Sequence, residues 1–171
     1  MTLVIVGAAA YGRGMTDHVV LRYTRTYPLE VAEAFERLLE LDLTALFDRR
    51  YAAIPRIAQV RDQEGPWRTP GQTRTIVLAD GGTMREELTA VESPSRFTYR
   101  ISGITGPMKH LIASLDGAWT FEPAGTGVRI GWTWTVRPEG RLGRLAMPVF
   151  GRMWRGNARQ AFDNIERLLV R

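Results

Sequence analysis

The sequence contains no cysteine and only two histidines, and these absences exclude several kinds of site. Without a thiol there is no disulfide, no thiolate metal ligand and no cysteine nucleophile, and a reducing cytoplasm is the simplest setting. His18 stands where a strand is expected to begin and His110 stands beside an expected loop, so a metal site or a catalytic triad has little to draw on. We therefore expect no metal, no cofactor and a cytoplasmic location.

Lysine is also scarce, because Lys109 is the only lysine among the 23 basic residues. The net charge is +5 and the isoelectric point is about 10.2, which raises nucleic acid or an anionic membrane as partners. The arginines are scattered among 18 carboxylates rather than gathered in one stripe. We therefore expect no nucleic-acid partner.

No apolar run is long enough to span a bilayer. The N-terminal stretch MTLVIVGAAAYGRG lacks the basic segment of a signal peptide, and its glycines do not have the spacing of a phosphate-binding loop. We expect residues 1–15 to form a weakly ordered leader, with Met15 as an alternative start. The composition, 44% hydrophobic and 24% charged in 171 residues, predicts one globular domain over residues 16–171.

The hydrophobic pattern changes its period along the chain. Residues 18–26 alternate as a strand, Pro28 begins a helical stripe that runs to Leu41, and Asp42 or Thr44 can cap a second short helix. Strand-like segments follow at residues 57–65, 73–80, 83–93, 96–102, 111–123 and 127–138. The breaks between them are short and rich in glycine and proline, so they can join only antiparallel neighbours.

The longest helical pattern is at the C-terminus. From Pro148 onward, apolar residues recur at three- and four-residue steps, with arginines and carboxylates on the opposite face. A stripe of this length needs a large concave surface to cover it. We expect an α+β fold in which a curved antiparallel sheet wraps around this helix, with two short helices after the first strand.

Three stretches resemble one known superfamily. They are Tyr27-Pro28-Leu29-Glu30-Val31 leading into Phe35, the segment Asp116-Gly117-Ala118-Trp119-Thr120-Phe121-Glu122-Pro123, and the segment Gly125-Thr126-Gly127-Val128-Arg129-Ile130 with Trp132. Together with the closing helix, they resemble the START-like, or Bet v 1-like (SRPBCC), superfamily and its bacterial polyketide cyclase/dehydrase and lipid-transport group. The resemblance implies a helix-grip fold with a deep apolar cavity between sheet and helix. The long apolar stripe of the final helix and the tryptophan-rich strands lead us to expect that this cavity binds a hydrophobic ligand such as a lipid, a polyketide or an isoprenoid.

Large rings on the last strands and on the final helix are the candidate cavity lining. Trp132 and Trp134 share one strand face, as do Trp119 and Phe121, so each ring either packs as ordinary core or touches a ligand. Asn157 is a polar residue on the buried stripe of the helix and can bond a ligand or a loop carbonyl. The candidate ligand-binding residues are Tyr23, Trp119, Phe121, Trp132, Trp134, Phe150, Met153, Trp154 and Asn157. Pro148 and Gly151 are poor helix formers, so we expect the ligand entrance around Phe150, Met153 and Trp154.

Two charged residues alternate along their strands with residues that are expected to face inward. Glu86 alternates with Leu88, and Arg25 alternates with Tyr23. We predict a Glu86–Arg25 pair inside the cavity with Tyr99 nearby, as a polar anchor for an apolar ligand. The alternative is that a bulge or a strand end turns both charges to solvent. If the protein is an enzyme, an aromatase/cyclase or a dehydratase, then Glu86, Arg25 and Tyr99 are its candidate catalytic residues.

A third interpretation concerns the arginines of the C-terminal region. Arg141, Arg144, Arg152 and Arg155 are interleaved with Leu142, Leu145, Phe150 and Trp154. This pattern is compatible with binding to a membrane surface or to a protein partner. The sequence does not indicate an oligomeric state.

Overall fold

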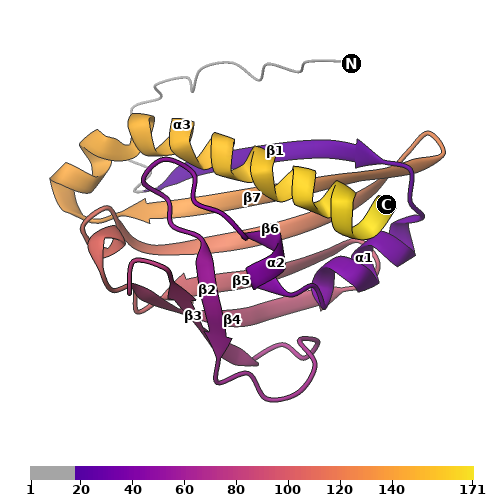
Figure 1. Ribbon diagram of the computed structural model, residues 1–171, viewed down its shortest axis with the longest axis horizontal. Coiled ribbons are helices and arrows are strands. Elements are labelled where there is room, and N and C mark those ends of the chain that lie inside the picture. The colour runs from indigo at the N-terminus through magenta and orange to yellow at the C-terminus, as the bar shows by residue number, and fades with distance from the viewer. Residues whose placement is uncertain (1–17) are drawn as a thin grey trace.

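The computed structural model describes residues 18–171 and contains one seven-stranded sheet (Figure 1). The strands are β1 (Val19–Tyr27), β2 (Ile57–Arg61), β3 (Thr73–Leu78), β4 (Thr83–Glu92), β5 (Arg96–Ser102), β6 (Ile112–Ala124) and β7 (Gly127–Pro138). Their order across the sheet is β1-β7-β6-β5-β4-β3-β2, and every neighbouring pair is antiparallel. The predicted antiparallel sheet is confirmed, and β5 and β7 have the predicted bounds. The predicted leader lies outside the described residues.

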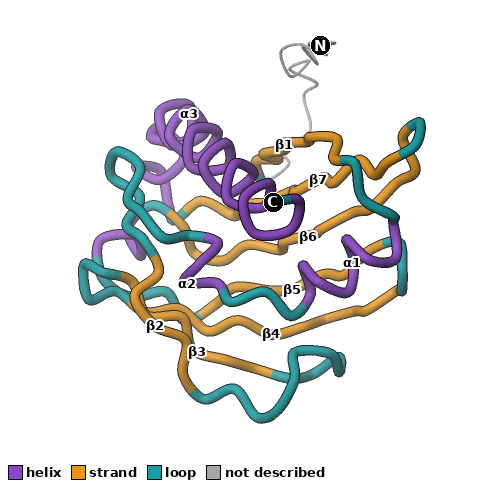
Figure 2. The backbone as a smooth tube through the Cα atoms, turned by 45° about the vertical axis from the view of Figure 1, so that its right-hand side comes forward, coloured by secondary structure: helices purple, strands orange, loops and turns teal. Residues whose placement is uncertain are grey.

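The helices lie on one face of this sheet (Figures 1 and 2). Two short helices, α1 (Val31–Leu39) and α2 (Leu43–Leu46), connect β1 to β2, and a single 3-10 turn, η1 (Pro107–His110), precedes β6. The Asp42 carboxylate accepts a hydrogen bond from the backbone N–H of Thr44 at 2.8 Å, so Asp42 rather than Thr44 caps α2. The predicted α+β helix-grip architecture is therefore present.

The long C-terminal helix begins earlier than predicted. Helix α3 spans Gly140–Ile165 and continues as the π-helical turn η2 (Glu166–Val170), so Pro148 lies inside α3 rather than at its start. Two contacts to Leu111 fix the first turn. The Glu139 N–H donates to the Leu111 carbonyl at 2.9 Å, and a Cβ on Gly143 would stand 2.6 Å from the same oxygen. Residues with poor helix propensity are helical here because tertiary contacts hold them.

Helix α3 packs its apolar face directly on the sheet. Phe150, Trp154 and Phe162 are fully buried, whereas Met153 is only partly buried. Gly151 lets the helix approach β1 closely, because a Cβ there would stand 3.2 Å from the Leu21 side chain. Little space therefore remains between α3 and strands β1 and β7.

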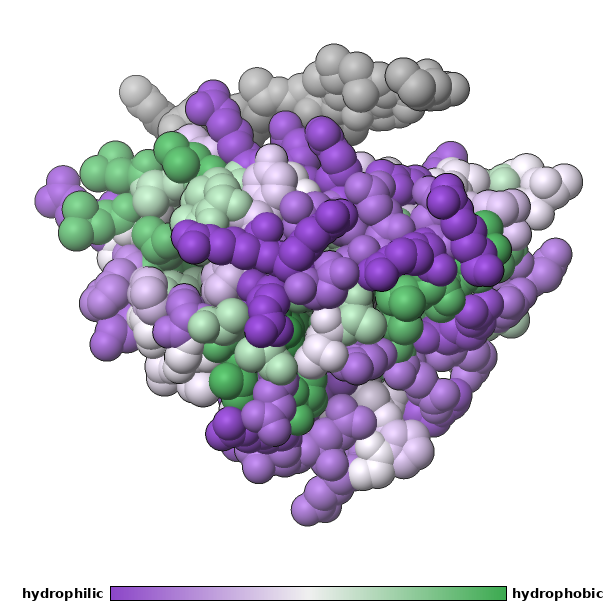
Figure 3. All heavy atoms as spheres, viewed as in Figure 1, coloured by the Kyte–Doolittle hydropathy of each residue, from purple (hydrophilic) through white to green (hydrophobic). Residues whose placement is uncertain are grey.

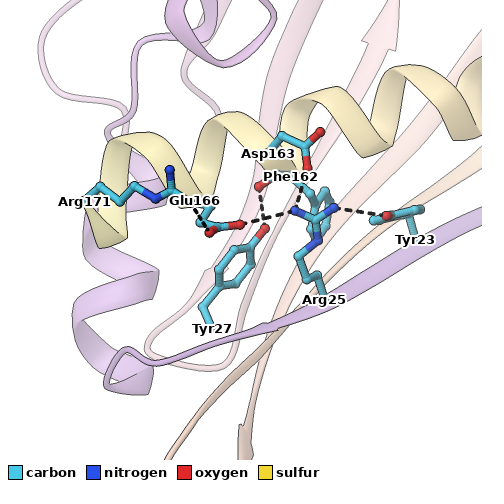
Figure 4. A network of polar contacts seen from close by, with 7 residues as sticks. All are labelled: Tyr23, Arg25, Tyr27, Phe162, Asp163, Glu166 and Arg171. Atoms are coloured by element: carbon cyan, nitrogen blue, oxygen red, sulfur yellow. Dashed lines mark hydrogen bonds and ion pairs between the residues drawn. The ribbon is translucent and has the colours of Figure 1, made fainter. Parts of the chain in front are cut away.

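Polar contacts tie β1 to the end of α3 (Figure 4). Arg25 donates to Asp163 at 2.7 Å and lies 3.8 Å from the Glu166 carboxylate, and the Tyr27 hydroxyl donates to the Phe162 carbonyl at 2.7 Å. The predicted Glu86–Arg25 pair is therefore wrong. Glu86 lies on β4, four strand spacings from β1, which is roughly 19 Å at about 4.8 Å per spacing.

These two contacts differ in how much stability they are expected to provide. Replacing Tyr27 with phenylalanine removes a buried hydrogen bond and should lower the free energy of unfolding by about 1 kcal/mol. Replacing Arg25 with methionine removes ion pairs to half-exposed carboxylates and should cost about 0.5 kcal/mol. Urea unfolding of both variants measures the two values. A larger loss for the Arg25 variant would contradict this assignment.

Candidate functional site

An apolar cavity lies between the sheet and the helices α1 and α2. The cavity has a volume of about 80 Å³. On the helical side it is lined by Leu38, Leu39, Leu41, Leu43, Leu46, Phe47, Ile54, Pro55 and Asn157. On the other side it is lined by Ile57, Trp67, Arg74, Ile76, Leu78, Met84, Glu86, Phe97, Tyr99, Ile101, Met108, Trp119, Trp132 and Trp134. Helix α3 therefore contributes one side chain, and the cover is built mainly by the short helices and their loops.

The predicted site residues divide into two groups. Those in the cavity wall are Trp119, Trp132, Trp134, Asn157, Glu86 and Tyr99. Those outside it are Tyr23, Phe121, Phe150, Met153, Trp154 and Arg25, and for these the predicted place in the cavity is wrong. The rings of Tyr23 and Phe121 meet other core rings instead. Tyr23 lies 4.8 Å from Phe162 between ring centroids, and Phe121 lies 5.3 Å from Phe35.

Three tryptophans of β6 and β7 form one wall of the cavity. Trp119 and Trp132 stack nearly parallel, with centroids 5.2 Å apart and planes 9° apart, and Trp134 meets Trp132 edge-on at 5.2 Å. Trp154 of α3 backs this group at 5.0 Å from Trp132. The wall is rigid because each ring is held by another, and it presents broad aromatic surface to a ligand.

Tyr99 supplies a hydroxyl group at the centre of this wall. Its oxygen accepts hydrogen bonds from the indole N–H groups of Trp132, at 2.7 Å, and Trp134, at 2.8 Å. The ring lies flat across Gly117 of β6, where a Cβ would stand only 2.1 Å from the Tyr99 Cζ atom. Burial raises the pKa of the Tyr99 phenol, and the nearby Glu86 raises it further, so the hydroxyl keeps its proton.

A buried ion pair forms the second polar feature of the wall. Arg74 donates hydrogen bonds to the Glu86 carboxylate and, at 3.2 Å, to the Gln63 side-chain oxygen. Its guanidinium also lies 4.0 Å from the centroid of the Trp67 ring. Glu86 is 4% exposed and Arg74 7%. Burial raises the pKa of Glu86, while Arg74 opposes that shift. The prediction that Glu86 faces inward is thus confirmed, and its partner is Arg74 rather than Arg25.

Arg74 and Trp67 were not among the sequence candidates. Arg74 has the same strand parity as Ile76 and Leu78, which are both buried, and this alternation could have identified it. Trp67 lies in the loop between β2 and β3, where no periodic pattern marks a side chain as buried.

Asn157 is the single α3 side chain in the cavity wall. It is 6% exposed, and within residues 18–171 its amide has no hydrogen-bond partner. A buried amide normally has such a partner, so its polar atoms are available to a molecule in the cavity.

A second hollow lies on the outer side of the cavity wall, beside the short helices. An outer hollow is lined by Glu40, Leu41, Asp42, Leu43, Val60, Gln63, Pro66, Trp67 and Arg74. Leu41, Leu43, Trp67 and Arg74 also line the cavity, so one layer of side chains separates the two spaces. The predicted entrance near Phe150, Met153 and Trp154 is wrong, because α3 is packed tightly against the sheet at Phe150 and Trp154.

Residues 18–171 contain no cluster of three or more histidine, aspartate or glutamate side chains that could hold a metal ion. The helices of the same residues are each too short or too polar to cross a bilayer.

The comparisons with known proteins agree with this fold. The family described as polyketide cyclase/dehydrase and lipid transport matches residues 18–170. The solved structure of Ara h 8.0201 has a TM-score of 0.64 at 16% identity, and the match covers 90% of this chain and 98% of that one. Ginseng major latex-like protein 151 from Panax ginseng has a TM-score of 0.60 at 12% identity, covering 88% and 96%. Protein Ms6760 from Mycobacterium smegmatis has a TM-score of 0.57 at 19% identity, covering 88% and 90%.

These structural similarities, all below one-fifth identity, show the fold alone. Among the curated proteins, no sequence matches the chain significantly. The family match covers almost all of the described residues, and the sheet, the two short helices and α3 have the arrangement of that fold. The chain therefore belongs to the polyketide cyclase/dehydrase and lipid transport family, with a Bet v 1-like helix-grip fold.

Proposed function

We propose that the protein binds an apolar small molecule that carries a flat ring and one hydrogen-bond acceptor oxygen, in the cavity beneath α1 and α2. The observation that carries this proposal is the phenol of Tyr99, held by two tryptophans in an otherwise apolar wall. Sites for small molecules commonly combine apolar walls with a few placed polar groups, which fix the orientation of the ligand. The family also includes lipid transport in its description, which supports an apolar ligand.

The acceptor oxygen follows from the hydrogen bonds of Tyr99. Both acceptor positions of the phenolic oxygen are used by indole N–H groups, so the hydroxyl proton is left to donate. Within residues 18–171 that proton has no acceptor. Two donors at the oxygen polarise the O–H bond and strengthen it as a donor. A carbonyl, ether or ester oxygen of a ligand would satisfy it, whereas a plain hydrocarbon would not.

A matched pair of ligands tests this assignment. Methyl naphthyl ketone and isopropenylnaphthalene have the same shape, but the ketone has a carbonyl oxygen where the alkene has a methylene group. Each is titrated as a competitor of the fluorescent reporter N-phenylnaphthylamine. We expect the ketone to bind about tenfold more tightly, the value of one neutral hydrogen bond of about 1.4 kcal/mol. Failure of all three molecules to reach a saturable site would overturn the proposal.

Replacing Tyr99 with phenylalanine should remove this preference. The ratio of ketone to alkene affinity is expected to fall from about ten to about one, because the donated hydrogen bond is lost while the aromatic surface stays. The ratio is an internal control, since a general loosening of the cavity would weaken both ligands alike. A preference that persists in the Tyr99→Phe variant would assign the donor to Asn157 instead, and Asn157→Leu would then abolish it.

Glu86 favours a second candidate function, a cyclase or dehydratase reaction in the same cavity. It is buried and lies in the cavity wall, and burial raises its pKa while Arg74 opposes that shift. A carboxyl group with a raised pKa is suited to general acid catalysis. The Glu86→Gln variant should then lose turnover of a poly-β-ketone substrate while still binding methyl naphthyl ketone. Equal turnover by this variant and by the natural protein would remove Glu86 from the reaction.

A further inference from the structure

The first half of α3 exposes apolar side chains on its outer face. Leu142 is 79% exposed, Leu145 77% and Val149 57%. They follow one another at three- and four-residue steps, so they form one row along the helix. Figure 3 shows hydrophobic residues gathered on the surface at the end of the molecule where α3 begins. The inward face of the same helix is fully used, since Met147, Phe150 and Trp154 pack on the sheet.

The same helix carries an unusual distribution of charge. From Gly140 to Phe162 it contains five arginines and no carboxylate. The net charge of the whole chain is also +5, so the rest of the sequence is charge-balanced. The arginines of α3 are thus the exception to the general mixing of charges along the chain.

The arginines lie beside the apolar row. Arg141 precedes Leu142, and Arg152 follows Val149 by three residues, so both stand within one turn of the row, and both are exposed. Glu139, directly before the helix, is the nearest exposed carboxylate on this segment. The outer face of α3 therefore combines exposed leucines with positive charge alone. This combination is typical of helices that lie in the interface of a membrane.

We propose that this face of α3 docks on the surface of an anionic lipid bilayer. Leu142, Leu145 and Val149 would enter the boundary between headgroups and acyl chains, and the neighbouring arginines would contact lipid phosphates. Each arginine near such a surface strengthens binding about fivefold, and this part of the affinity falls with salt.

Charge favours a membrane over the other possible occupants of this face. A second copy bound through the same patch would form a two-fold interface, which brings Arg141 and Arg152 of one copy close to those of the other. Single-stranded nucleic acid would find no exposed tryptophan, tyrosine or phenylalanine on this helix for base stacking. None of the three apolar residues lines the cavity, so this inference is independent of the proposed ligand site.

Vesicle sedimentation tests the inference with the full-length protein. Vesicles of phosphatidylcholine and phosphatidylglycerol in equal parts should retain the protein, and vesicles of phosphatidylcholine alone should bind it at least tenfold more weakly. Raising the salt concentration should release it. Equal binding to both vesicle types, or no binding to either, would overturn the proposal.

Two variants and one matched control separate the contributions. L142S/L145S removes the apolar contact and R141Q/R152Q removes two charges, and each should weaken binding at least tenfold. All four positions are exposed, so the folded protein should unfold at an unchanged temperature. Val20 is an exposed apolar residue on the outward face of β1, at 59% exposure, and V20S should bind vesicles normally. Unchanged binding by L142S/L145S would overturn the proposal. The proposal would also be overturned if the natural protein did not bind vesicles but formed a dimer that L142S/L145S abolished.

Discussion

Replacing Arg74 with methionine is expected to lower the free energy of unfolding at pH 7 by about 3–5 kcal/mol, which is the typical cost of breaking a buried ion pair from one side. The guanidinium donates to the Glu86 carboxylate and to Gln63, and it lies over the Trp67 ring. Methionine fills much of the same volume but offers no donor, so the variant leaves Glu86 buried without a partner. Urea unfolding measures the loss.

The loss should depend on pH with a definite sign. Burial raises the pKa of Glu86 above the ordinary carboxyl value of about 4.3, and removing Arg74 takes away the charge that opposes this shift. A carboxyl group with a raised pKa in the folded state contributes its stability below the ordinary value, and that stability is lost as the pH rises through the raised pKa. The destabilisation of Arg74→Met should therefore be largest at neutral pH and should shrink towards pH 4.

A double variant serves as the control. In Arg74→Met/Glu86→Leu neither charge is present, and the cavity wall becomes wholly apolar at this point. Replacing a buried ion pair by apolar residues of similar size is often neutral or stabilising, so this variant should recover most of the loss. If the double variant were as unstable as Arg74→Met, the loss would come from the missing packing on Trp67 rather than from the unpaired carboxylate.

The fold was accessible from the sequence because the signals that specify it are local. Strand alternation in β5 and β7 and the glycine- and proline-rich breaks between strands are patterns a few residues long, and antiparallel neighbours follow directly from short connections. The same alternation placed Glu86 and Tyr99 on the inward face. Parity states which face a residue occupies and nothing about its distance from another strand. The error in pairing Glu86 with Arg25 has this cause, since the two strands lie on opposite sides of β5, β6 and β7.

The position of the cavity could not be read from the sequence for a different reason. The apolar stripe of α3 predicts burial, and a buried ring can meet either another ring or a ligand. Phe150, Trp154 and Phe162 are buried between α3 and the sheet, and the cavity lies beneath α1 and α2 instead. The hydrophobic patterns of these two short helices are too brief to predict a cavity. Which of two apolar surfaces closes tightly depends on the volumes of many side chains together, and that is a property of the packed structure.

Gly117 provides the second large effect, because it is the residue that makes room for Tyr99. A Cβ at this position would stand 2.1 Å from Cζ, 2.4 Å from Cε2 and 2.5 Å from the oxygen of Tyr99. The Gly117→Ala variant must therefore move the tyrosine ring. The phenolic oxygen then leaves the indole N–H groups of Trp132 and Trp134, and the fully buried Trp132 loses its acceptor. We expect the free energy of unfolding to fall by about 2–4 kcal/mol, from overpacking and an unsatisfied buried donor together.

The same substitution should weaken methyl naphthyl ketone binding at least tenfold, since the donor moves away and the displaced ring enters the cavity. A double-mutant cycle isolates the cause. In a Tyr99→Ala background the space above Gly117 is open, so adding Gly117→Ala should cost less than about 0.5 kcal/mol, and the two positions should show a coupling of about 2 kcal/mol. Gly131→Ala is a matched glycine on β7, where the obstacle is the rotatable Thr120 hydroxyl at 2.5 Å, and it should cost less than Gly117→Ala. If Gly117→Ala lowered the free energy of unfolding equally with and without the tyrosine ring, the backbone geometry of β6 would require the glycine, rather than the space that Tyr99 needs.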